Sequence, residues 1–147
     1  MGYCANSESS DFLILPENMA AVAEIVRRYY GEDSARLTND IDLIDDAFAS
    51  GAGLTIDLDT DHNGEEYISG LYFEFDKYHD ADIKELFDAI KDYVEPGSYI
   101  SFAGEDDCFW SFYFDDVNGM RQVSEFKGRV IYDGMPEKRP DRKKIKR

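Results

Sequence analysis

The sequence predicts an α+β domain in which two or three helices pack on one face of a largely antiparallel sheet. Three observations favour this class: three segments carry apolar stripes with helical spacing, one segment alternates between apolar and polar residues, and the C-terminal half consists of short apolar runs separated by turn residues. The chain has 147 residues, a common size for one domain. A chain of this length buries roughly 68–70% of its unfolded surface, so it needs no metal or disulfide to fold.

The first part of the chain is expected to form a strand and then a helix. Residues 11–15 (DFLIL) are a short apolar run, which predicts a strand. Pro16 suits the first turn of a helix, and this helix is expected to end near Gly31. Its apolar stripe recurs at spacings of three and four: Met19, Val22, Ala23, Val26 and Tyr30.

A second, shorter helix is expected to begin after Thr38 or Asn39, either of which can act as its N-cap. Asp40 and Asp42 would lie in its first turn, where the helix dipole favours negative charge. The run Gly-Ala-Gly at residues 51–53 is expected to end it. The apolar face of this helix comprises Ile41, Ile44, Ala47 and Phe48.

The middle of the chain predicts a β-hairpin and a third helix. In residues 54–59, Leu54, Ile56 and Leu58 point one way and polar residues point the other, which is typical of a half-buried strand. Asn63-Gly64 predicts a two-residue turn, and residues 67–75 are the expected partner strand. The third helix is expected from residue 80 or 81 to residue 94, before Pro-Gly at 96–97.

The remainder is expected to be an antiparallel meander with strands at residues 99–102, 108–115, 121–126 and 129–132. Residues 108–114 are apolar at both odd and even positions, which predicts a central strand covered on both faces. We expect one domain over residues 1–134 and a basic, flexible tail over residues 135–147.

Charge is the strongest signal in the composition. The chain has 16 basic and 32 acidic residues and a net charge of −16. Residues 137–147 carry seven basic and two acidic side chains, so residues 1–136 have a net charge of −21. A body this acidic repels nucleic acid, which argues against direct binding of DNA or RNA. The basic tail is typical of a nuclear-localisation or nucleic-acid patch, but it could also contact the acidic body or simply solvate the terminus.

The chain shows neither a signal peptide nor an apolar run long enough to span a membrane, so we expect a cytoplasmic protein without membrane contact. Its two cysteines, Cys4 and Cys108, are too few for a disulfide scaffold. Cys108 opens an aromatic strand, and we interpret it as a small buried apolar residue.

Catalytic motifs are absent from the sequence. It contains no nucleophile elbow, phosphate-binding glycine loop or zinc-ligand spacing, and its histidines, His62 and His79, lie in loops without obvious convergence. The many paired carboxylates single out no general acid or base. We therefore expect a protein that binds rather than catalyses.

One loop matches the opening of a calcium-binding loop. Residues 59–64 (DTDHNG) offer oxygen ligands at Asp59, Asp61 and Asn63 and a glycine for the turn. The twelfth position, where a bidentate glutamate is expected, is Gly70, and the flanks predict strands instead of helices. A calcium-binding module and a solvated polar hairpin tip are the two interpretations of this loop.

Two groups of aspartates are the candidate partner-binding residues. On the predicted strand, alternate residues lie roughly 6.6–6.8 Å apart, so Asp57, Asp59 and Asp61 would form a row of carboxylates. On the second helix, Asp42, Asp45 and Asp46 lie about one turn apart. Such spacing can imitate the charge density of DNA for a basic protein that binds nucleic acid. The alternative is an acidic surface that serves solubility alone.

Several short segments resemble small acidic proteins encoded by bacteriophages and integrated mobile elements. They are the opening Met1-Gly2-Tyr3, residues 87–90 (FDAI) with 97–100 (GSYI), and residues 104–106 (GED) with 109–112 (FWSF). Some of those proteins inhibit host defence, including anti-restriction and anti-CRISPR proteins, and some imitate DNA. The resemblance implies an inhibitor of a nucleic-acid enzyme and transfers no catalytic residue. An immunity or antitoxin protein against a basic toxin would use the same electrostatics.

Overall fold

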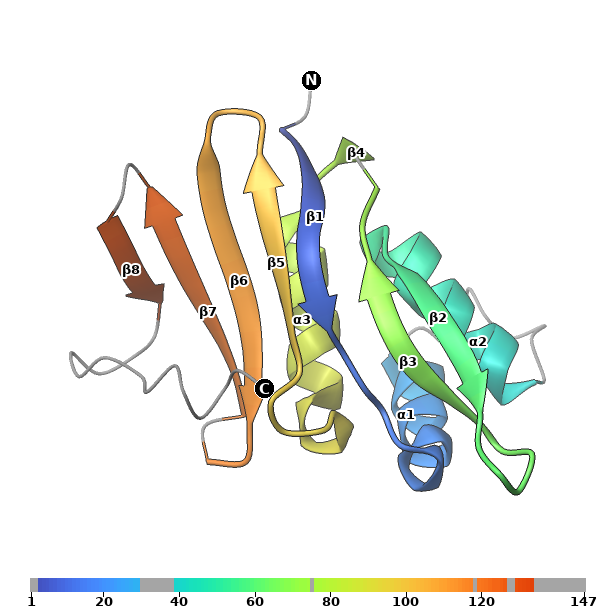
Figure 1. Cartoon of the computed structure of the whole chain (residues 1–147). Coiled ribbons are helices and arrows are strands. Elements are labelled where there is room, and N and C mark those ends of the chain that lie inside the picture. The colour runs from blue at the N-terminus through green and yellow to red at the C-terminus, as the bar shows by residue number, and fades with distance from the viewer. Residues whose placement is uncertain (1–2, 30–38, 75, 118, 127–128, 134–147) are drawn as a thin grey trace.

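A computed structural model describes residues 3–29, 39–74, 76–117, 119–126 and 129–133 (Figure 1). The predicted tail at residues 135–147 lies outside these residues. The helices are α1 (Pro16–Tyr29), α2 (Asp40–Asp46) and α3 (Asp80–Ile90). The strands, in chain order, are β1 (Cys4–Asp11), β2 (Thr55–Thr60), β3 (Glu66–Tyr72), β4 (Asp76–Lys77), β5 (Tyr99–Gly104), β6 (Cys108–Asp115), β7 (Gly119–Phe126) and β8 (Arg129–Asp133).

The strands form two antiparallel sheets that together make one curved layer. One sheet has the order β4-β1-β5-β6-β7-β8, and β2 pairs with β3 in the other. The second sheet continues the layer beside β1, because Ser7 N donates to Phe73 O (2.8 Å) and Ile14 forms a single bridge with Ile68. The three helices lie behind this layer (Figure 1). The α+β class, with helices on one face of largely antiparallel sheets, is confirmed.

The core lies between the helices and the sheets and is rich in phenylalanine. Phe12 and Phe87 stack on each other at 6.0 Å between ring centroids, and both meet Phe114 edge to face. Helix α1 contributes apolar residues that its spacing predicted, including Val22 and Val26, and α3 contributes Ile83, Leu86 and Ile90, all fully buried. In α2 the prediction was partly wrong, because Leu43 is fully buried and Ile41 is only half-buried. This core fixes the positions of α2 and β2 at one end of the molecule.

The first predicted strand was placed wrongly. Residues 12–15 cross from the sheet to α1 in extended form, and the strand itself is β1, whose sequence (CANSESSD) has no apolar alternation. Its serines make the connection to β3: Ser10 Oγ donates to Leu71 O (2.6 Å) and Ser7 Oγ accepts from Phe73 N (2.9 Å). Side-chain hydrogen bonds of this kind leave no signal in a hydrophobicity pattern.

The hairpin turn also differs from its prediction. The loop contains three residues, 62–64, because Asp61 N donates to Glu65 O (2.9 Å). Gly64 has a φ of 83°, the left-handed conformation that closes three-residue hairpin loops. Further along, a β-bulge leaves Ser69 without an opposite residue on β2.

The central strand β6 is covered on one face only. Phe112 and Phe114 are buried under the helices, whereas Phe109, on the opposite face, is 38% exposed. Cys108 is half-buried instead of fully buried. Within the described residues, no helix has both the length and the apolar character needed to cross a membrane.

Candidate functional site

The three aspartates on α2 are held outward by the way this short helix packs. Asn39, one of the two predicted N-caps, caps it by accepting hydrogen bonds from Ile41 N (2.8 Å) and Asp42 N (3.2 Å). Leu43 and Ile44 are fully buried, so the opposite side of the helix faces solvent. Asp42 and Asp45 are exposed there, and Asp46 is half-exposed and accepts from Ser50 Oγ (3.1 Å).

The strand aspartates point to the opposite side of the sheet from the helices. Ile56 is buried against the helical layer, and side chains alternate along a strand, so Asp57 and Asp59 project from the uncovered face. Asp57 lies across the backbone of β3 at Gly70, where a β-carbon would come within 2.8 Å of Asp57 Oδ2. Gly70 therefore makes room for this carboxylate.

Both groups of aspartates lie at the same edge of the molecule. A short π-helical turn (Ala47–Gly51) extends α2, and Gly53, with a φ of 73°, reverses the chain into β2. Leu54 N then donates to Phe48 O (2.8 Å), which fastens the start of β2 to the end of this turn. The helix therefore runs back behind the strand, at the edge of the layer that β2 forms (Figure 1).

The two groups flank this edge from opposite sides and do not form one flat surface. We name the edge, with its six aspartates, the acidic edge: Asp42, Asp45, Asp46, Asp57, Asp59 and Asp61. None of the six makes an ion pair with another described residue. On α2, the described ion pair is the one that Asp40, outside the group of six, makes with Arg27 of α1 at 3.5 Å. No cation from the described part of the chain therefore neutralises the acidic edge, and its members Asp46 and Asp61 are half-exposed and accept local hydrogen bonds.

The predicted calcium loop uses its carboxylates to build the hairpin. Asp61 Oδ1 accepts from Asn63 N (2.8 Å) and Glu65 N (2.9 Å), and Asp59 Oδ1 accepts from Thr60 N (2.8 Å). Among the described residues, no group of three or more His, Cys, Asp or Glu side chains has an arrangement that could hold a metal ion. These hydrogen bonds are the signature of an Asx turn, which needs no metal.

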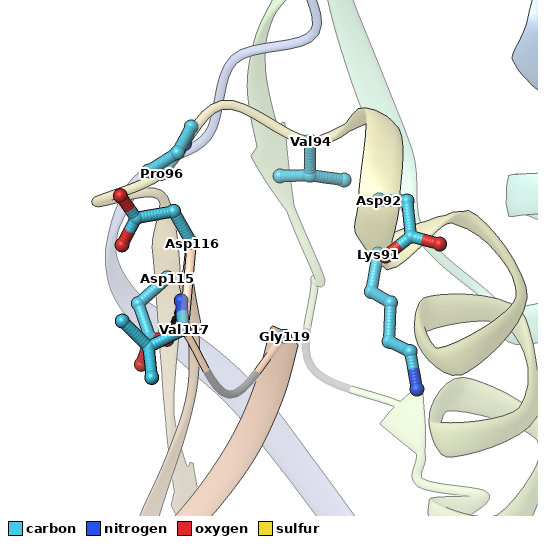
Figure 2. Close-up of a pocket in the computed structure, with 8 residues that line it drawn as sticks. All are labelled: Lys91, Asp92, Val94, Pro96, Asp115, Asp116, Val117 and Gly119. Carbon is cyan, nitrogen blue, oxygen red and sulfur yellow. Dashed lines mark hydrogen bonds between the residues drawn. The ribbon is translucent and has the colours of Figure 1, made fainter.

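A cavity of about 380 Å³ opens where the β6–β7 turn faces the end of α3 (Figure 2). Lys91 and Asp92 stand on one side, Asp115 and Asp116 on the other, and Gly119 lies between them. Two of its four charged residues already serve the fold: Asp115 Oδ1 accepts from Val117 N (2.9 Å), Asp115 Oδ2 lies 3.2 Å from the Nε of the buried Arg121, and Lys91 pairs with Asp88 at 2.8 Å.

A chain of hydrogen bonds behind β6 was not foreseen from the sequence. Trp110 Nε1 donates to Tyr78 Oη (2.7 Å), and Tyr78 Oη donates to Asp80 Oδ1 (3.0 Å), which also accepts from Gln122 Nε2 (3.2 Å). Burial, followed by the nearby negative charge of Asp80, raises the pKa of Tyr78 far above its usual range. A neutral tyrosine that bridges an indole and a carboxylate stabilises the fold, and it offers no group that titrates near neutral pH.

The two histidines do not converge, whereas the thiol of Cys108 lies beside Asp106. His62 lies in the β2–β3 turn and His79 precedes α3, at separate places in the fold. Cys4 and Cys108 are free thiols, and burial raises the pKa of Cys108, aided by a hydrogen bond and the charge of Asp106. A raised pKa makes a thiol a poorer nucleophile at neutral pH.

Comparison with family profiles, with curated proteins and with solved structures finds no match to this chain.

Proposed function

We propose that the chain is a non-enzymatic binding protein that uses the acidic edge to bind a basic protein. The observation that carries this proposal is the set of six aspartates on both sides of one sheet edge, none of them paired with a described cation. Three of these carboxylates, Asp46, Asp59 and Asp61, accept hydrogen bonds from neighbouring groups, but no described cation neutralises any of the six. They remain free to steer and hold an incoming cationic surface.

The partner that we propose is a basic enzyme that acts on nucleic acid, which the chain would inhibit by occupying its cationic channel. Two elements of similar length support this: β2 spans roughly 20 Å and α2 with its π-helical turn roughly 18 Å, from the rise per residue of each. Six carboxylates over about 20 Å amount to one charge per roughly 3.3 Å, close to the one charge per roughly 3.4 Å of a single strand of a DNA duplex. The resemblance to phage inhibitors favours the same class of partner.

A basic toxin, neutralised by this chain as an immunity protein, is the alternative partner of the same chemistry. The two differ in the target and not in the mechanism, so identification of the captured protein distinguishes them. Either partner would be met in the cytoplasm, a location that suits two free cysteines.

The experiment is a pull-down from nuclease-treated bacterial lysate with three variants, over a series of salt concentrations. One variant neutralises the helix group (D42N/D45N/D46N) and one the strand group (D57N/D59N/D61N). A matched control neutralises three exposed acids on α1 and α3 (E17Q/D82N/E85Q), which make no ion pair within the described residues.

We expect the wild type and the control to recover the same basic protein at low salt, and both neutralised variants to lose it. Screening weakens the interaction as the Debye length falls from about 10 Å at 0.1 M toward about 3 Å at 1 M salt. If all four proteins recover the same partner equally, the acidic edge is not the binding surface.

A further inference from the structure

The outer edge of β2 has peptide groups that pair with no other strand. Within the described residues, β2 pairs with β3 alone. Asp61 N donates across to Glu65 O, and peptide groups of an antiparallel strand alternate in direction, so residues 57, 59 and 61 face β3. The peptide groups of Ile56, Leu58 and Thr60 therefore face outward.

One hydrogen bond confirms this assignment of directions. Thr60 N donates to the carboxylate of Asp59 (2.8 Å) and not to β3. No described hydrogen bond involves the N–H or C=O groups of Ile56 and Leu58, so two residues offer two donors and two acceptors along the edge. That is the set of groups that a further β-strand would pair with.

The side chains around these groups select what can pair with them. Leu58 is 39% exposed, in contrast to Leu54 and Ile56 on the same side of the strand, which are 0% and 8% exposed. Asp57 and Asp59 precede and follow Leu58 along the strand. A neutral strand would bring no counter-charge to these carboxylates, and a second copy of β2 would add like charges, which destabilise cross-strand pairs.

We propose, resting on the function proposed above, that β2 takes up an extended cationic segment of the basic partner as an additional strand. Lysine or arginine at alternate positions of that segment would repeat every 6.6–6.8 Å, roughly the spacing of Asp57 and Asp59. The intervening positions would face Leu58 and favour apolar residues. Backbone hydrogen bonds would supply affinity, and the carboxylates would supply selection for charge.

The test uses a capped nine-residue peptide of alternating lysine and valine as the probe, with binding measured by fluorescence anisotropy at low ionic strength. Leu58→Pro removes the outward N–H and blocks the edge, while pairing with β3 stays intact because that N–H does not face β3. Leu58→Thr is the matched control, since it removes the leucine side chain and keeps the N–H.

We expect Leu58→Pro to weaken binding by at least about tenfold and Leu58→Thr by no more than about threefold. Amide hydrogen exchange of the wild-type protein gives a second readout that needs no variant: bound peptide should protect the amides of Ile56 and Leu58. Unprotected amides, or equal affinities of the two Leu58 variants, would overturn strand addition.

The outcomes separate this inference from the proposed function. If D57N/D59N/D61N loses the peptide and Leu58→Pro retains it, the acidic edge binds cations without strand addition, and only the inference fails. If the neutralised variant also retains the peptide, the inference fails, and the proposed function fails with it only if the helix-group and strand-group variants both still recover the partner in the pull-down. Sedimentation of the wild type tests the other occupant, the basic segment at residues 137–147 of a second copy. Self-association that removal of this segment abolishes would overturn the assignment of the edge to a partner protein.

Discussion

Replacement of Tyr78 by phenylalanine tests the hydrogen-bond chain that joins α3 to the sheet. The ring contacts survive, because phenylalanine keeps the packing against Trp110, Phe102 and Phe73, whose centroids lie 4.8, 5.1 and 6.0 Å away. The hydroxyl alone is lost. Trp110 is 8% exposed, so its indole N–H is left without its acceptor in a place that admits little water.

The expected cost is dominated by that indole N–H. An unsatisfied buried donor costs about 1–3 kcal/mol. Asp80 loses one donor but keeps Gln122 Nε2 and the Lys84 ion pair at 3.3 Å, and solvent can reach it. We therefore expect a loss of about 2 kcal/mol, which lowers Tm by about 4–8 °C in a domain of this size. Urea unfolding followed by tryptophan fluorescence and thermal unfolding followed by circular dichroism measure the two quantities.

A matched control and a change of pH make the prediction specific. Tyr113→Phe removes a hydroxyl that makes no hydrogen bond within the described part of the chain, and it should change stability by less than about 0.5 kcal/mol. The pKa of Tyr78 is raised in the folded state, whereas the tyrosine of the unfolded chain titrates near pH 10. Its contribution to the free energy of unfolding is therefore complete below pH 10 and is lost as the pH rises above that value. Above pH 10, the free energy of unfolding of the wild type should therefore fall by about 1.36 kcal/mol per pH unit more than that of Tyr78→Phe. The reasoning would be refuted if the stabilities of the wild type and Tyr78→Phe fell in parallel above pH 10, or if Tyr78→Phe and Tyr113→Phe lost equal stability.

Three further predictions concern the carboxylates that the fold uses. Asp61→Ala removes the acceptor of two turn N–H groups, and we expect a loss of about 1 kcal/mol in urea unfolding; Asp57→Ala, which removes no backbone partner, should cost less. Tyr3→Phe removes the hydrogen bond that chiefly lowers the pKa of Asp106, so NMR titration of that carboxyl should show its pKa rising toward the ordinary value, and an unchanged pKa would contradict this cause. Calorimetric titration with calcium up to millimolar concentration should give no binding heat, because Asp61 already serves the turn; a saturable isotherm would revive the calcium interpretation.

The sequence was sufficient to predict the elements whose burial or capping follows from a local pattern of residues. The stripe of α1, a cap of α2 at Thr38 or Asn39 and the four strands of the C-terminal meander were predicted because burial and capping act over a few neighbouring residues. β1 could not be predicted in this way. Its polar residues form a strand only because β5 pairs with it on one side and β3 meets it on the other, and both contacts join segments far apart in the chain.

The candidate site shows the same division. The alternation at residues 54–59 indicated correctly that the aspartates face away from the core, and the spacing on α2 indicated a solvated row. Sequence spacing did not reveal that Gly53 returns the chain so that helix and strand meet at one edge. Nor did it reveal the outward peptide groups of Ile56 and Leu58, since which strand lies at an edge depends on the pairing of the whole sheet.

The acidic edge has a second explanation that needs no partner, and the two explanations make different demands on Leu58. Charged side chains protect open edges against pairing with other copies, so Asp57 and Asp59 would be useful even in a protein that binds nothing. Protection alone, however, gives no reason to leave Leu58 39% exposed between them. An apolar side chain at an open edge favours self-association, which is the effect that the two carboxylates would prevent. Neutralising the strand group should raise self-association under either explanation. Only recognition requires that the same change abolish binding of a cationic strand, and that blocking the Leu58 amide do so while every carboxylate stays in place.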